Sequence, residues 1–236
     1  MTTYEEIHQA LVFHSLPEKA AFFPRFFKTG KGEYGEGDVF LGVTVPNQRL
    51  IAKQFYASTD EHLIIQLLDS KYHEERLIGL FLLNHKFLTA RKQHAEKQWV
   101  DLYLEKIERV NNWDLVDSSA HIILGQWLED KDRSLLYKLA AEKNLWKNRI
   151  AILSTMHFIK KGDIVDILKL SALLLTHQHD LMHKAIGWML REAWKKEPAI
   201  IENFIRKHIQ NMPRTMLRYS IEKMEEGKRK EFLALK

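Results

Sequence analysis

Apolar residues recur three and four positions apart along most of the chain, and this spacing is typical of one buried face of an α-helix. The pattern is clear in residues 63–68 and 77–87. It predicts an all-α protein and a further helix in each of these segments: Trp99–Val110, Trp113–Leu128, Leu135–Glu142, Trp146–Ile159, Ile164–Leu175, Leu181–Trp194, Ile200–Ile209 and Met216–Met224. Pro46, Pro198 and Pro213 lie where they can open helices, because a first-turn proline gives up a hydrogen bond that would not be made anyway.

The expected helices, taken in pairs, recur roughly every 31 to 38 residues, which is typical of HEAT-like repeats. Stacked pairs would form a helical-repeat solenoid, an α-α superhelix with a concave surface suited to an extended partner. We interpret residues 1–236 as a single domain of this kind.

One short stretch departs from the helical pattern. Half of the ten glycines fall in it (Gly30, Gly32, Gly35, Gly37 and Gly42), and the run Val39–Val45 is rich in β-branched residues. Glycine-rich turns followed by such a run indicate a loop or a small hairpin inserted near the N-terminus.

Composition narrows the class of protein. Hydrophobic residues make up 45% and charged residues 28%, which is ordinary for a globular chain. The absence of cysteine excludes disulfides, thiol catalysis and cysteine-bound zinc. The start has no secretory pattern and no apolar run approaches the length of a membrane span, so we expect a cytoplasmic protein. The net charge of +5 favours nucleic acid only weakly.

Three segments place aromatic residues beside residues that carry chemistry. In NNWDLVD, Trp113 and Asp117 are four apart and would share one helix face. In LWKNRIAIL, Asn144 can cap a helix that carries Arg149, and in HKAIGWMLREAW a mid-helix glycine, Gly187, precedes Trp188. Taken singly, each segment also fits a packed core tryptophan or a solvated arginine.

Taken together with the upstream LGVTVP, these segments resemble the AlkD-type family of bacterial DNA alkylation-repair glycosylases, from about Phe40 to Trp194. The resemblance implies HEAT-like repeats around duplex DNA, with no cofactor. It also implies that Asp117 is the catalytic carboxylate, that Trp113 and Trp188 form the aromatic walls of its cleft, and that Arg149 holds a DNA phosphate. Active members excise cationic lesions such as N3-methyladenine and N7-methylguanine.

That chemistry suits the residues. Alkylation of a purine ring nitrogen leaves the base positively charged, so the base departs as a neutral molecule without an acid catalyst. The sugar left behind resembles an oxocarbenium ion, which a fixed carboxylate stabilises, and indole faces attract cations. Further candidate contacts to DNA phosphates are Lys147, Asn148, Lys184, Arg191, Arg214 and Arg218, although each also fits a solvated helix face.

Two departures keep other functions open. Active members often carry a second tryptophan just before the Trp-Asp pair, where this chain has Asn112, and the insert around Glu33–Asp38 occurs in relatives that resemble branched-DNA binders. The alternative is therefore a non-catalytic relative that binds bent or branched DNA, and a scaffold for protein or RNA is a third possibility. His177, His179 and His183 lack the spacing of a metal site, and we expect a monomer without a bound metal.

Overall fold

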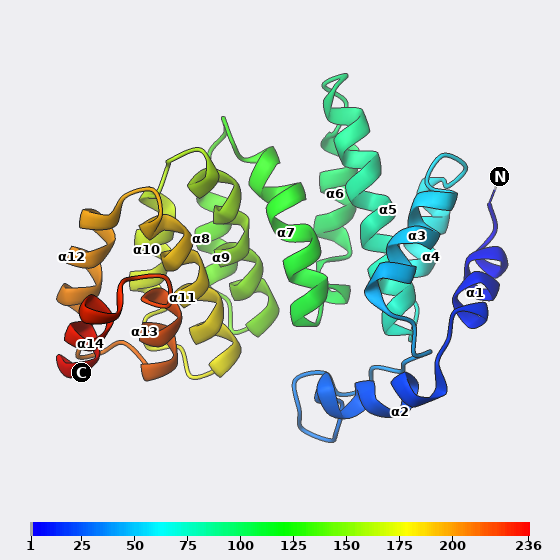
Figure 1. Ribbon diagram of the computed structural model, residues 1–236. Helices are drawn as coiled ribbons and strands as arrows, with labels where there is room; N and C mark the ends of the chain where they lie inside the picture. Colours follow the sequence, from blue (N-terminus) through cyan, green and yellow to red (C-terminus); the bar gives the residue numbers. More distant parts are fainter. Residues whose placement is uncertain (1) are drawn as a thin grey trace. The chain divides into compact units, whose positions relative to one another are not determined.

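The computed structural model describes residues 2–236, and these residues confirm the all-α prediction (Figure 1). The β structure among them is a single bridge between Val39 and Tyr72. The helices run in chain order as α1 Tyr4–Phe13, α2 Pro17–Phe26, α3 Val45–Phe55, α4 Glu61–Leu68, α5 His73–Arg91, α6 Lys97–Glu105, the 3₁₀ turn η1 Ile107–Arg109, α7 Trp113–Trp127, α8 Ser134–Ala141, α9 Leu145–Lys160, α10 Val165–Leu173, α11 Asp180–Trp194, α12 Pro198–His208, α13 Arg214–Ser220 and α14 Glu226–Ala234.

The starts of the helices follow the local sequence. Asn144 caps α9, because its side chain accepts hydrogen bonds from the backbone N–H groups of Trp146 and Lys147. Pro46 and Pro198 lie in the first turns of α3 and α12, and Pro213 immediately precedes α13, as predicted. Among the helices of residues 2–236, none is long and apolar enough to cross a membrane.

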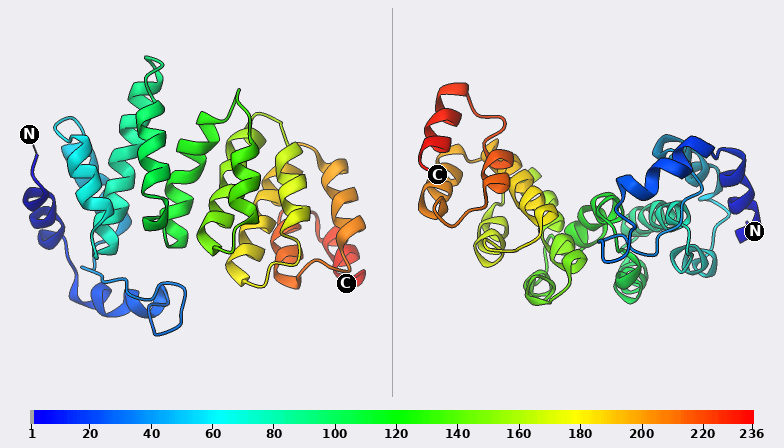
Figure 2. Two further views of the ribbon diagram at one scale, coloured as in Figure 1. Left: turned by 180° about the vertical axis from the view of Figure 1, so that it is seen from behind. Right: turned by 90° about the horizontal axis from the view of Figure 1, so that it is seen from below.

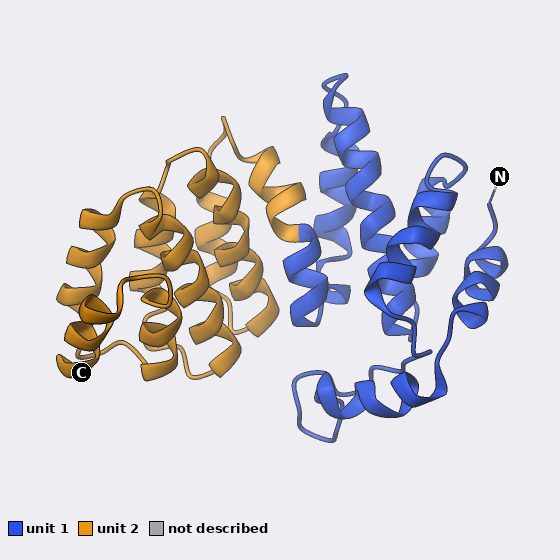
Figure 3. Cartoon of the chain, in the orientation of Figure 1, with its two compact units in different colours: residues 1–119 blue, residues 120–236 orange. Residues whose placement is uncertain are grey.

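The chain forms two compact units, residues 1–119 and 120–236 (Figure 3). In unit 1, the long helix α5 packs against α3, α4 and α6, and α1 packs against α3 and α4. Helix α2 runs across the ends of α3 and α5 instead of lying beside them (Figures 1 and 2). The N-terminal ends of α3, α5 and α7 therefore share one side of unit 1 with α2 and the loop that follows it.

The glycine-rich insert is a loop, not a hairpin, and the start of α5 holds its end in place. The buried carboxylate of Glu74 accepts hydrogen bonds from the backbone N–H groups of Leu41, Gly42 and Val43, at 2.8 to 3.2 Å. Gly42 adopts a positive φ of 89°, and a Cβ there would lie 2.7 Å from the backbone nitrogen of Ala20 on α2. Both constraints require glycine at this position.

Unit 2 is centred on α9 and α11, which pack against each other, while α8 packs on α9 and α13 packs on α11. Gly187 lies at the α11–α13 contact. A Cβ on Gly187 would come within 2.5 Å of the Tyr219 Cβ and within 2.6 Å of the Met216 carbonyl oxygen. The close approach of α13 to α11 thus explains the glycine in the middle of this helix.

We expect Gly187→Ala to lower the free energy of unfolding by about 1 to 3 kcal/mol, because the added methyl group must push the backbone of α13 away from α11. Gly227→Ala provides the matched control, since Gly227 lies in α14 and a Cβ on it would meet nothing within 4 Å. That change should raise stability by up to about 1 kcal/mol. Urea unfolding followed by circular dichroism measures both, and equal effects of the two variants would contradict the packing argument.

Candidate functional site

The first group of candidate residues lies at the start of α7 in unit 1. Trp113 is the first residue of the helix and Asp117 lies one turn later, and both side chains are half-buried. The Asn112 side-chain oxygen accepts a hydrogen bond from the Trp113 backbone N–H at 2.9 Å, which satisfies one of the unpaired donors of a helix start. The predicted pair therefore does share one side of a helix, with the indole and the carboxylate a turn apart.

The Trp113 indole is held by aromatic side chains from α2 and the residue after it. Phe27 stacks on it, with ring centres 5.4 Å apart and the planes inclined by 13°. Phe26 meets it edge to face at 5.9 Å. Phe27 is itself stacked on Phe40 at 5.0 Å, and both phenylalanines are buried. The orientation of Trp113 is thus fixed by packing against the segment that precedes the glycine-rich loop.

A buried charge network lies directly beneath these rings. The imidazole of His73 bridges two carboxylates, with Nδ1 2.9 Å from Asp38 and Nε2 2.8 Å from Asp114. Arg76 pairs with the second oxygen of Asp38, and the Asn112 amide donates to Asp38 at 3.2 Å. Because Asp38 belongs to the loop and Asp114 to α7, the network joins the loop to the starts of both α5 and α7.

The network determines the charge of its members. Burial opposes a charged His73, yet the adjacent carboxylates of Asp114 and Asp38 outweigh that effect and raise the pKa of His73 to about 9. Burial also raises the pKa of Asp38, but hydrogen bonding to His73 and the charge of Arg76 more than offset it, so the pKa of Asp38 is lowered overall. At neutral pH, His73 is therefore an imidazolium between two carboxylates.

Asn112, the residue just before the Trp-Asp pair, belongs to this network. Its side chain is fully buried, and a Cβ on Gly35 would lie 3.1 Å from its amide nitrogen. A small amide at this position accommodates the glycine loop and bonds to Asp38, whereas an indole would occupy the space of the loop. Asn112 and the glycine-rich loop thus fit each other.

The second half of the candidate residues lies in unit 2, where two of them are buried. Asn148 donates hydrogen bonds from its side-chain amide to the carbonyl oxygens of Leu139, Ala140 and Glu142, at 2.9 to 3.0 Å. It joins α8 to α9 and is 3% exposed, so we leave it out of the proposed DNA contacts. Arg149 is also buried and donates to the Leu181 carbonyl oxygen at 2.6 Å, which joins α9 to the start of α11.

Helix α11 carries three of the predicted residues along one line. Lys184, Trp188 and Arg191 are four and three positions apart, and all three are half-buried on a helix whose other faces are packed. The cations already have carboxylate partners: Lys184 pairs with Asp180 at 2.6 Å, and Arg191 pairs with Glu222. Outside this line, Lys147 pairs with Glu142, and Arg214 donates to the Leu233 carbonyl oxygen.

The histidines near the start of α11 form hydrogen bonds with backbone groups. His179 is the N-cap of α11, and its ring nitrogen accepts a hydrogen bond from the Leu181 N–H at 3.1 Å. His183 bonds to the carbonyl oxygen of His177. Within residues 2–236, no group of three or more histidine or carboxylate side chains is arranged to hold a metal ion.

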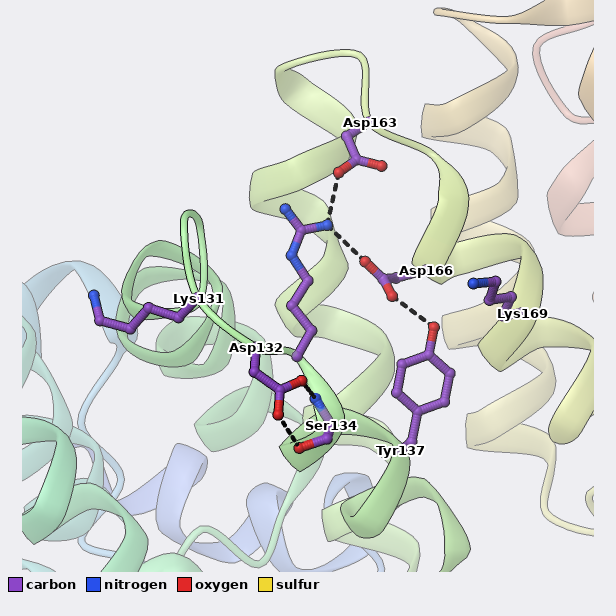
Figure 4. A pocket seen from close by; sticks show the side chains of 8 residues that line it. Lys131, Asp132, Ser134, Tyr137, Asp163, Asp166 and Lys169 are labelled. Carbon is purple, nitrogen blue, oxygen red and sulfur yellow. Dashed lines mark hydrogen bonds and ion pairs between the residues drawn. The ribbon is translucent and has the colours of Figure 1, made fainter.

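A shallow pocket of unit 2 that the sequence did not indicate lies beside α8 and α10 (Figure 4). Arg133 donates to both Asp163 and Asp166 at 2.6 Å, and the Tyr137 hydroxyl donates to the other oxygen of Asp166. Burial and the bond to Asp166 raise the pKa of Tyr137. These charges pair with one another across the gap between α8 and α10, so the cluster fits a role in helix packing.

The His73 network predicts a pH-dependent stability. A raised folded-state pKa contributes fully below the ordinary value of 6.5 and is lost as the pH rises through about 9. We expect the free energy of urea unfolding to fall over this range by at most about 3 kcal/mol. His73→Gln should be less stable at pH 6.5 and show little of this fall, while His62→Gln, an exposed histidine on α4, should retain it. A native protein equally stable at both pH values would contradict the charged bridge.

Comparisons with known proteins agree with the motifs. Residues 7–224 match the sequence profile of a family described as DNA alkylation repair enzyme. A solved structure described as a predicted DNA alkylation repair enzyme from Enterococcus faecalis has a similar fold, with a TM-score of 0.71 and 18% identity over 90% of this chain and 98% of that one. No curated protein sequence matches. Since the profile spans nearly all of the sequence, the chain belongs to the DNA alkylation repair enzyme family, as its motifs predicted.

Proposed function

We propose that the protein is a DNA glycosylase that hydrolyses the N-glycosidic bond of cationic alkylated purines in duplex DNA, of the N3-methyladenine and N7-methylguanine type. One observation carries the proposal. In a member of a DNA alkylation repair family, α7 presents a half-buried carboxylate, Asp117, one turn from Trp113, an indole that Phe27 holds by stacking.

The reaction needs few groups. The glycosidic bond between the sugar C1′ and ring nitrogen N9 of the alkylated purine breaks, and its electron pair leaves on the base, which cancels the positive charge of the base. The sugar is left as an oxocarbenium-like cation, which the carboxylate of Asp117 stabilises in a site lined by aromatic faces. Water then adds to C1′ and loses a proton, for which the carboxylate is an acceptor, and an abasic site results.

The remaining residues have supporting roles in this proposal. Trp188 on α11 offers DNA an aromatic face in unit 2, and Lys184 and Arg191 on the same line of the helix bind phosphates. Arg149 is too buried to reach a phosphate and acts instead by position, because its bond to the Leu181 carbonyl joins α9 to the start of α11. Lys147 exchanges its partner Glu142 for a phosphate.

A second function is favoured by one observation. The buried Asn112 replaces an aromatic residue of active relatives and bonds instead to Asp38 of the glycine-rich loop. A relative that has exchanged an aromatic side chain for a loop bonded to the start of α7 is also suited to bind bent or branched DNA without excising a base. Base release and DNA binding by Asp117 variants distinguish this function from the glycosylase.

Asp117→Asn should abolish base release from duplex DNA treated with a methylating agent, by at least about 100-fold, because the amide cannot stabilise a developing cation. Its affinity for the same duplex, measured by fluorescence anisotropy, should be unchanged or higher, since a negative charge near DNA is removed. The measurement is the rate of methylpurine release, separated by liquid chromatography.

Asp101→Asn is the matched control, because Asp101 is an exposed carboxylate of unit 1, on α6. This variant should release base at the native rate. Release by Asp117→Asn at the native rate would refute the catalytic role, and binding without release by the native protein would support the branched-DNA function instead.

Lys184→Gln should weaken binding to duplex DNA of any sequence and lower the slope of log affinity against log salt by about 1, as expected for one lost phosphate contact. Lys97→Gln is the control, because Lys97 also pairs with a carboxylate four positions along its helix, Asp101 on α6. The slope of this control should equal the native slope. A Lys184 variant with an unaltered slope would remove α11 from the proposed DNA surface.

A further inference from the structure

Helix α2 is unusual in this fold because none of its ten residues is buried. Phe22 and Phe26 are 51% and 48% exposed, and they lie one turn apart on the same face. Their rings stack on each other, with centres 5.8 Å apart and planes inclined by 28°. Two stacked and exposed phenylalanines form an apolar surface of the kind that marks a binding site.

This surface continues the aromatic wall of the candidate site. Phe26 meets the Trp113 indole edge to face at 5.9 Å, and Trp113 is one turn from Asp117 on α7. The three rings of Trp113, Phe26 and Phe22 therefore form one aromatic row that starts at the candidate site and ends in solvent. We call this row the aromatic ladder.

The charges around the ladder fit a polyanion. Residues 17–31, which comprise α2 and the five residues after it, carry one acidic side chain, Glu18, and four basic ones: the half-buried Lys19 and the exposed Arg25, Lys28 and Lys31. An apolar helix or a second copy of this chain would have to cover rings that stand among these cations. Aromatic rings flanked by cations are instead the common feature of surfaces that bind unpaired nucleic acid.

We infer that the exposed end of the ladder, Phe22 and Phe26, binds an unpaired nucleobase of the DNA that occupies the candidate site. The inference rests on the proposed function, in that DNA is the ligand. Every nucleobase has a flat face, so the ladder would bind a base by stacking without reading its identity. The ladder thus makes the protein prefer DNA whose base pairing is disrupted beside the site.

The test compares two DNA ligands with the full-length protein, measured by fluorescence anisotropy: a duplex with one unpaired base in its centre, and the fully paired duplex. The double variant Phe22→Ala with Phe26→Ala should bind the unpaired-base duplex about 10-fold more weakly, since a stacked base contributes about 1 to 3 kcal/mol. Its affinity for the paired duplex should stay within about twofold of the native value, because the phosphate contacts remain.

Two further variants make the result specific. Phe22→Leu with Phe26→Leu keeps the apolar volume and removes the aromatic faces, so it should lose the preference as the alanine variant does. Phe13→Ala removes an exposed phenylalanine outside the ladder, on α1, and should bind both duplexes as the native protein does. Thermal unfolding of each variant confirms that it is folded.

Three outcomes would overturn the inference: equal losses on both duplexes, full rescue by leucine, or unchanged DNA binding together with loss of self-association in the alanine variant. These outcomes are distinct from failure of the proposed function. If the native protein prefers the unpaired-base duplex through the ladder yet releases no methylpurine, the glycosylase assignment fails and the ladder stands. If it releases methylpurines at rates that the alanine variant shares, with no binding preference, the ladder fails and the glycosylase stands.

Discussion

The start of α5 is the constraint on which the rest of unit 1 depends. Four consecutive ionisable residues, 73–76, are all nearly inaccessible to solvent, although buried charges are costly unless each finds a partner. Together they contact the glycine-rich loop, α1 and α7. Glu74 binds the end of the glycine-rich loop, Glu75 bonds to Tyr4 and His8 of α1, and His73 and Arg76 bind Asp38. A single helix end thereby specifies where α1, α7 and the loop lie.

This arrangement explains why the carboxylate and indole of α7 are suited to chemistry. Electrostatic stabilisation of a cation works only if the stabilising group is already in place and need not be reoriented. His73 anchors α7 through Asp114, and Asp114 lies between Trp113 and Asp117 in the sequence. The stacked Phe27 then fixes the indole from the other side. Trp113 and Asp117 thus lie at the start of α7, which the His73–Asp114 ion pair and the packing of Phe27 hold in place.

Much of the fold was predictable from the sequence because most helices here bury a regular apolar face. The same approach missed the buried network, since a pattern-based interpretation assigns charged residues such as Glu74 and Arg76 to solvent. A usable signal was present, namely four adjacent ionisable residues at the start of a long apolar helix. The candidate phosphate contacts differ in their burial and bonding, which the sequence could not show for a related reason. Residue type suggested phosphate contacts for Lys184 and Asn148 alike, yet only the tertiary structure distinguishes a half-buried lysine from an amide that bonds to three carbonyls.

The pairing of the cations bears on how the proposed enzyme would select its substrate. Lys147, Lys184 and Arg191 each pair with a carboxylate, so binding a phosphate breaks an existing ion pair, which offsets part of the attraction. With a net charge of only +5, the protein has no strong general field for DNA. Discrimination must therefore come from contacts that differ between damaged and normal DNA. A carboxylate and an aromatic face favour positive charge on the base and sugar, while an exposed aromatic ladder favours a base that has lost its pair. Both preferences are satisfied by an alkylated, distorted duplex, and neither is satisfied by intact DNA.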